Sequence, residues 1–182
     1  MNVGVYPVTV AMYRHYCSLT SRQMPQLPSF GWFEDHPMVN VNWDNVQDYC
    51  AWVKSYYQEK VRLPYDNEWT IIARGGLHPT ITPYPWGDAY IDNSTWTSVR
   101  SRRFSTVSVA RTHNTYLNGY GVLDVSGNVA EWLQDSKDGQ KCFVTGSWYS
   151  AEQTYGMCQS RAYQIPIFRR DWLGFRLVTI DT

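Results

Sequence analysis

Helix signals in this sequence end at Gly75-Gly76, and this restricts the second half of the chain to a loop-rich β structure. From residue 77 to residue 182 the chain is rich in Gly, Pro, Asn, Ser and aromatic residues, and no apolar helical period recurs. Aromatic residues make up 16% of the chain, a fraction suited to covering irregular backbone with large flat side chains. Short β-like segments are predicted at 107–109, 127–133, 142–147 and 174–178.

Three helices are predicted before that point, over residues 10–19, 43–58 and 66–74. Thr9 and Asn42 precede the first two helices as N-caps, because their side-chain oxygens can accept a free N–H of the first turn. Apolar residues at helical spacing are expected to face the core. They are Val10, Tyr13 and Cys17 in the first helix, Val46, Cys50, Val53 and Tyr57 in the second, and Trp69, Ile72 and Ala73 in the third.

Length and charge favour one domain spanning residues 1–182, with no nucleic-acid partner. The formal net charge is zero, whereas phosphate binding usually requires a basic excess. The N-terminus MNVGVYPVTV lacks the basic and apolar regions of a secretory signal, and no apolar run approaches the roughly 20 residues of a membrane span. We therefore expect synthesis in the cytoplasm, with display on a phage particle or a cell surface left open.

The cysteines and histidines do not form a recognisable metal motif. No CxxC is present and the four His are isolated, so neither a zinc site nor a histidine iron site is expected. Reduced, buried thiols are expected for all four Cys, with Cys142 and Cys158 as the pair to check for a bridge. The locally basic segment 99–111 is interpreted as a solvated loop, with an anionic-ligand patch as the alternative.

Several motifs, taken in order, resemble the formylglycine-generating enzyme family, also called the sulfatase-modifying factor domain. They are PVTVAMYRHYC, HPMVNVNWDNVQDYCAW, RLPYDNEWTIIARGG, YPWGD, NGYGVLDVSGNVAEW, TGSW and LGFRLV. The resemblance extends from about Val8 to Val178. It implies a C-type lectin-like fold: a loop-rich α+β domain with two to three short helices and small antiparallel sheets.

The resemblance does not extend to the family's catalytic residues. Members that oxidise a sulfatase Cys use a close pair of Cys just after the GS-aromatic motif. Here Ser150 stands where the first of these would fall, no second Cys follows at the needed spacing, and Cys158 matches a structural Cys of the family. Because a hydroxyl cannot replace a thiolate in copper binding, neither a copper site nor this oxidase activity is expected.

The segment DVSGNVAEW matches a loop that wraps a calcium ion in the family. By that resemblance, Asp124 and Glu131 would supply carboxylate oxygens, and Gly127 and Val129 would supply backbone carbonyls. Hard oxygen ligands on a Gly-bent loop suit calcium. The alternative is that Asp124 and Asn128 only hydrogen-bond a tight turn.

The segment GSWYSAEQTYGMCQSRAYQIPIFRRDWLGFR, residues 146–176, resembles the variable region of diversity-generating retroelement proteins. In that branch a retroelement rewrites C-terminal codons at template adenines, between a GSW-type start and a GFR-type end. The pattern here is Arg161, four slots, Pro166, two slots, Arg169, three slots and Leu173. The codon AAC, altered at its adenines, encodes most residues found in the slots, whereas Gln164 and Trp172 require another template codon.

Rigid aromatic residues and Arg give binding surfaces most of their energy, because they bury large areas at a small entropic cost. The region 148–172 is therefore predicted to bind a ligand through Tyr149, Ala151, Tyr155, Tyr163, Ile165, Phe168, Arg170, Asp171 and Trp172. Its backbone is predicted to be fixed by Trp148, Arg161, Pro166, Arg169, Leu173 and Phe175. Burial of the aromatic residues in the core is the alternative, although residues 164–168 do not alternate as a core strand would.

These features favour a non-catalytic protein that displays a hypervariable surface to a protein or a cell-surface glycan. One alternative is an enzyme of the formylglycine-generating type with unfamiliar chemistry, which would need a nucleophile or metal set that is not apparent. The other is a fixed interaction domain on the same scaffold. The sequence leaves the oligomeric state open.

Overall fold

The three helices form where the cap residues and the apolar spacing predict them. A computed structural model of the chain describes residues 1–76, 82–89, 104–109, 118–150, 155 and 157–180. Helix α1 spans Val10–Thr20, α2 spans Trp43–Tyr57 and α3 spans Asp66–Arg74. Thr9 accepts a hydrogen bond from the Met12 N–H, and Asn42 accepts one from the Asn45 N–H, as N-caps do. None of the helices in these ranges is long and apolar enough to span a bilayer.

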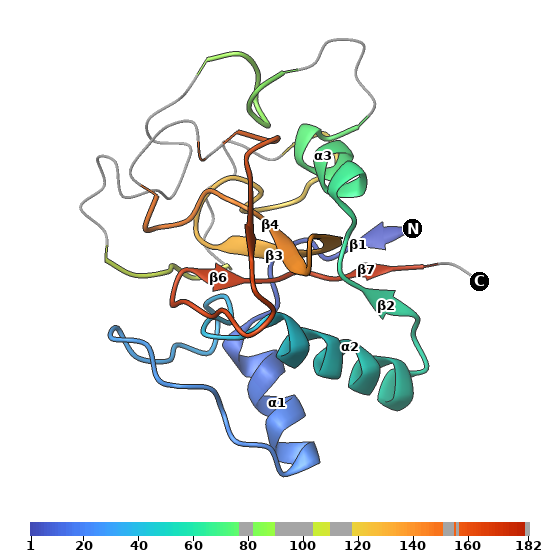
Figure 1. Ribbon diagram of the computed structural model, residues 1–182, viewed down its shortest axis with the longest axis vertical. Helices are drawn as coiled ribbons and strands as arrows, with labels where there is room; N and C mark the ends of the chain where they lie inside the picture. The colour runs from blue at the N-terminus through green and yellow to red at the C-terminus, as the bar shows by residue number, and fades with distance from the viewer. Residues whose placement is uncertain (77–81, 90–103, 110–117, 151–154, 156, 181–182) are drawn as a thin grey trace.

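Two small sheets lie between the helices. In Figure 1, α1 and α2 occupy one end of the molecule and α3 lies toward the other. The three-stranded sheet has the order β1-β7-β2, with both pairs antiparallel, and it joins the two ends of the chain. Its strands are β1 (Asn2–Val3), β2 (Val61–Arg62) and β7 (Val178–Thr179).

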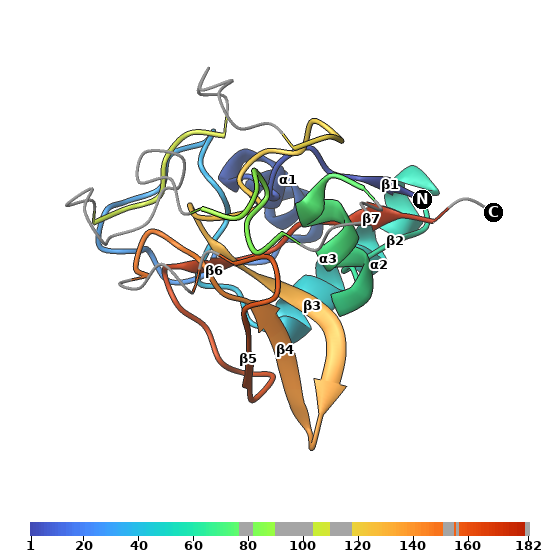
Figure 2. The same ribbon diagram turned by 90° about the horizontal axis from the view of Figure 1, so that it is seen from above.

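The four-stranded sheet has the order β5-β4-β3-β6 and carries the predicted binding region along one edge. Its strands are β3 (Ala130–Lys137), β4 (Gln140–Val144), β5 (Arg161–Gln164) and β6 (Leu173–Gly174). The β3–β6 pair is parallel and the other pairs are antiparallel. Figure 2 shows the β3–β4 hairpin projecting from the molecule, with β5 beside it. Strand β5 is an edge strand because only β4 pairs with it.

The strand predictions are only partly confirmed, and the backbone explains the differences. Gly127 and Asn128 have φ angles of 106° and 60°, so the strand predicted from residue 127 begins only at Ala130. The segment 174–178 divides between the end of β6 and the start of β7, and residues 107–109 form no strand. Strands β1, β2 and β5 were not predicted, because two to four residues are too few to show a period.

The main core lies between α1, α2 and the strands, and stacked aromatic rings fill much of it. The Tyr13 and Tyr49 rings stack with their centroids 5.5 Å apart, and both rings contact Phe175 edge-on. The predicted core residues are buried with one exception. Tyr57 is 52% exposed, because it ends α2, and Tyr49 takes the expected place in the buried stripe.

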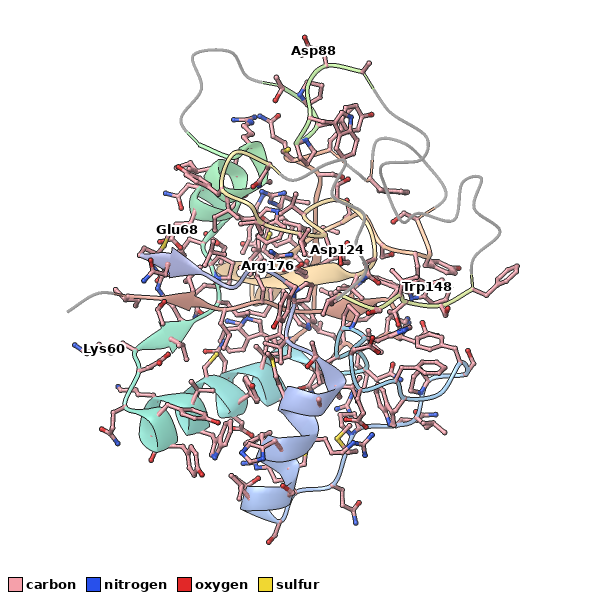
Figure 3. The ribbon with its side chains drawn as sticks, turned by 180° about the vertical axis from the view of Figure 1, so that it is seen from behind. Lys60, Glu68, Asp88, Asp124, Trp148 and Arg176 are labelled. Carbon is pink, nitrogen blue, oxygen red and sulfur yellow. The ribbon has the colours of Figure 1, made fainter. Side chains whose placement is uncertain are left out.

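A buried ion pair joins several segments that are distant in the sequence. Arg176 and Glu131 are 0% and 1% exposed, and their closest nitrogen–oxygen distance is 2.9 Å. The Arg176 guanidinium also donates to the carbonyls of Gly4 and Leu123. Its carbon lies 5.0 Å from the centre of the Trp69 ring on α3. Figure 3 shows Arg176 near the middle of the molecule.

We expect Arg176→Met to lower the free energy of unfolding by about 3–5 kcal/mol, because it leaves the Glu131 carboxylate buried without its counter-ion. Urea denaturation followed by circular dichroism measures the change. Arg14→Gln is the control, since Arg14 pairs with Glu34 at 2.9 Å with both side chains well exposed. Loss of an exposed pair costs about 1 kcal/mol or less. Equal, small effects of the two substitutions would contradict the central role of the buried pair.

Candidate ligand-binding surface

Trp148 fixes the start of the predicted binding region to its end. Gly146 precedes it with a φ of 100°, a backbone conformation that favours glycine. The Trp148 N–H donates to the Asn128 carbonyl at 2.9 Å, and its indole N–H donates to the Asp171 carbonyl at 3.0 Å. The side chain is only 7% exposed. The GSW motif is therefore structural, as predicted.

Arg161 fixes the middle of the region to helix α3. Its Nε donates to the Asp66 carboxylate at 2.6 Å, and its Nη2 donates to the Thr70 hydroxyl at 2.9 Å. Its Nη1 donates to the Cys158 carbonyl at 2.9 Å. These charge-assisted bonds hold the first residue of β5, and they confirm the anchoring role predicted for Arg161.

The remaining predicted anchors are confirmed except for one. The Pro166 carbonyl accepts the Trp43 N–H at 3.0 Å, and Leu173 and Phe175 are fully buried. Arg169 was predicted to fix the backbone, and this is wrong. Its side chain is exposed and forms no hydrogen bond or ion pair with the residues that the structure describes.

The side chains that project from this fixed backbone are mainly aromatic and apolar. Tyr163 lies on edge strand β5, and Ile165 and Ile167 lie in the turn that follows it, where the Phe168 N–H donates to the Ile165 carbonyl at 3.0 Å; all three side chains are exposed. Ile167, at 65% exposed, was not among the predicted binding residues, although it occupies one of the two slots after Pro166. The other exposed members are Tyr149, Tyr155 and Arg170. We call these six residues together with Phe168, Asp171 and Trp172 the 149–172 surface.

Phe168 and Trp172 belong partly to the core and partly to this surface. Both are half-buried, and Trp172 lies 6.0 Å from the Phe143 ring of β4. On its other side Trp172 stacks with Tyr149, with ring centroids 6.1 Å apart. The Arg170 guanidinium carbon lies 4.4 Å from the centre of the Phe168 ring. The aromatic residues thus form a continuous layer from the core to the solvent.

The structure describes Asp171, but it does not describe Ala151 or most of the basic segment 99–111. Asp171 is half-buried, and burial raises the pKa of its carboxyl. Ala151 lies outside the described residues, so its binding role stays a prediction. The same holds for most of the basic segment 99–111, of which only 104–109 is described.

The site offers no activated cysteine nucleophile. Ser150, at the position of the family's first catalytic Cys, is buried and accepts a hydrogen bond from the Ser147 N–H at 2.8 Å. All four Cys are buried and free, which confirms reduced thiols, and the Cys142–Cys158 bridge is not formed. Burial raises the pKa of both of these thiols to about 11, so the nucleophilic thiolate is disfavoured at neutral pH.

Both carboxylates that were predicted to bind calcium already have protein partners. The Asn128 amide donates to the Asp124 carboxylate at 3.0 Å, which is the turn contact considered as the alternative. Arg176 contacts both carboxylate oxygens of Glu131, and burial raises the pKa of that acid. A calcium ion at Glu131 would have to share the carboxylate with the buried guanidinium, so the ion pair disfavours a second cation there. Calcium binding through Asp124, Gly127, Val129 and Glu131 stays a prediction.

Comparison with known proteins gives a family and a fold. The family described as the sulfatase-modifying factor enzyme 1-like domain matches residues 3–180. The inactive C-alpha-formylglycine-generating enzyme 2 of Bos taurus is 35% identical over 106 residues, covering 54% of this chain and 32% of its own length. The formylglycine-generating enzyme of Streptomyces coelicolor is 32% identical over 110 residues, covering 56% and 32%. The chain thus spans about a third of the length of these relatives.

Two solved structures have similar folds at low sequence identity. Treponema denticola variable protein 1 has a TM-score of 0.75 at 19% identity, covering 96% of this chain and 82% of its own. PvdO from Pseudomonas aeruginosa has a TM-score of 0.81 at 20% identity, covering 97% and 79%. These comparisons confirm the predicted fold class, an α+β C-type lectin-like fold of the formylglycine-generating enzyme type.

The contrast between Trp148 and Tyr149 tests which residues support the fold and which are displayed. We expect Trp148→Ala to lower the free energy of unfolding by about 3–5 kcal/mol, since it removes a buried ring and its hydrogen bonds. Tyr149→Ala should change it by roughly 0.5 kcal/mol, because Tyr149 is 62% exposed. Urea denaturation measures both values. A large loss on Tyr149→Ala would support the alternative that the aromatic residues are core.

Calcium dependence is tested by melting the protein in EDTA and in excess calcium. We expect the same Tm in both, because Arg176 already neutralises Glu131. A calcium-dependent rise in Tm that Asp124→Asn removes would instead establish an ion in this loop, since a ligand that binds only the folded state stabilises it.

Proposed function

The chain belongs to the sulfatase-modifying factor enzyme 1-like domain family, and on that premise we propose that it is a non-catalytic member that binds a ligand through the 149–172 surface. One observation carries the proposal: the described backbone of this region is held by buried contacts, while several of its side chains are exposed to solvent. Trp148 and Arg161 provide the fixing, and Tyr149, Tyr163 and Ile167 are displayed. A rigid backbone reduces the entropy lost on binding.

We propose further that the surface is diversified by a retroelement. The anchored positions Arg161, Pro166 and Leu173 fall between the slots of the variable pattern, as a scaffold requires. Among the slots, Tyr163, Ile165, Ile167 and Arg170 are exposed, so their replacement would alter the surface and leave the core intact. The structural likeness to Treponema denticola variable protein 1 is consistent with this use of the fold.

An oxidase of the formylglycine-generating type is less well supported. That chemistry uses a pair of reactive thiolates, whereas this chain has a buried hydroxyl at Ser150 and four buried thiols. One of the two relatives is named as an enzyme and the other as an inactive protein, so membership of the family does not by itself decide activity. The local chemistry at Ser150 therefore carries the argument.

The ligand is proposed to be a protein or a cell-surface glycan. Tyr, Trp and Arg side chains on one face are typical of hot spots in recognition surfaces. The stacked pair Tyr149–Trp172 and the Arg170–Phe168 contact contribute to such a face. This composition suits a broad partner better than a small apolar molecule.

The DNA flanking the gene tests diversification directly. We expect a near-copy of the codons for residues 146–176, together with a neighbouring reverse transcriptase gene. The copy should differ only at its adenines, and those adenines should fall in the codons of the slots. Sequencing the locus settles the question. Without such a copy, the fixed interaction domain would be the better account, and the ligand would then be sought by pull-down.

A further inference from the structure

A polar cavity of about 370 Å³ lies beside the 149–172 surface. The chain that follows α1 forms one wall through Arg22, Gln23 and Gln26. The first turn of α2 contributes Asn45, and the segment after β5 contributes Arg169. The cavity is therefore lined by Arg169, the residue whose predicted role in fixing the backbone was wrong. Its size falls at the lower end of the range for small-molecule sites.

Two guanidinium groups face this cavity with little to neutralise them. Arg169 is exposed and has no side-chain partner among the residues that the structure describes. Arg22 donates from Nη1 to the Asp48 carboxylate at 2.8 Å, and its other N–H groups bond to no described residue. Two cations and one counter-ion leave a net positive site that favours an anion.

The amide side chains around the cavity add donors. The Asn45 oxygen accepts the Asn42 N–H, so its amide nitrogen remains as a donor. In the described part of the chain, the side chains of Gln23 and Gln26 have no hydrogen-bond partner. A donor-rich, positively charged cavity is complementary to an oxyanion that carries several further acceptors.

The cavity is built entirely from positions outside the variable slots. Arg22, Gln23, Gln26 and Asn45 precede the variable region, and Arg169 stands between the slots 167–168 and 170–172. Diversification would therefore leave this cavity unchanged while altering the surface next to it. A constant subsite can recognise only a chemical group that many ligands share.

We propose that this cavity is a constant subsite for a carboxylated sugar unit of the ligand. The two guanidinium groups bind the carboxylate of the sugar, and the three amide groups bind its ring hydroxyls. An Asp or Glu side chain of a protein ligand carries a carboxylate but no such hydroxyls. The cavity also exceeds the volume that one carboxylate group fills. The proposal rests on the proposed function in one respect: the sugar belongs to the ligand that the 149–172 surface binds.

Titration of the full chain with potassium glucuronate, glucose and potassium acetate tests the subsite. We expect saturable shifts of the Arg and amide side-chain NMR signals with glucuronate, and at least tenfold weaker binding of glucose and acetate. Arg169→Gln should weaken glucuronate binding about tenfold, because it removes a charge-assisted hydrogen bond. Arg14→Gln is the control, since Arg14 is an exposed Arg that pairs with Glu34 and does not line the cavity.

Three results would overturn the proposal. They are the absence of saturable glucuronate binding, equal affinities of acetate and glucuronate, and equal losses on Arg169→Gln and Arg14→Gln. Equal affinities would instead indicate a site for the acidic side chain of a protein ligand. An unchanged Tm for both variants confirms that neither acts through unfolding. Because the titration uses a monosaccharide, its result is independent of whether the flanking DNA carries a variable-region copy.

Discussion

The buried pair of Arg176 and Glu131 is the constraint on which the rest of this loop-rich fold depends. Taking two charges out of water is costly, and the cost is met only where every hydrogen-bonding group finds a partner. The Arg176 guanidinium achieves this by contacting β3, the N-terminal segment and the loop at Leu123 at once. The N-terminal segment and the loop form little regular secondary structure, and the contacts of Arg176 hold them together with β3 at one point. The same arginine closes the GFR motif, so the end of the binding region is anchored in the centre of the molecule.

Because its backbone is anchored by other residues, the 149–172 surface can expose most of its side chains, although Phe168 and Trp172 also pack against the core. Trp148 joins the two ends of the region, and Arg161 joins its middle to α3. Between these contacts, Tyr163 on edge strand β5 and Ile165 and Ile167 in the turn after it are exposed to solvent. The backbone conformation is fixed before a ligand arrives, so little conformational entropy remains to be lost on binding. This separation of scaffold from displayed positions is what a surface of changing sequence requires.

The same fold carries both enzymes and binding proteins, and single positions decide between them. At Ser150 a buried hydroxyl occupies the place of a catalytic thiol, and the nearest cysteines are buried with raised pKa values. At Arg169 an unpaired guanidinium faces a polar cavity instead of fixing the backbone. The first position supports the proposal of a non-catalytic member. The second supports the proposed subsite beside the 149–172 surface.

The sequence by itself determined what depends on neighbours within a few residues: the caps at Thr9 and Asn42, the stop at Gly75, and the motifs that identify the family. Tertiary structure decided the features whose partners lie far along the chain. Glu131 is a credible calcium ligand in its own loop, but Arg176, 45 positions later, contacts both of its oxygens. Likewise, Phe168 and Trp172 are half-buried because they pack near Phe143 of β4, which lies far earlier in the chain. Local hydrogen bonds leave a pattern in the sequence, whereas burial and charge pairing are properties of the packed chain.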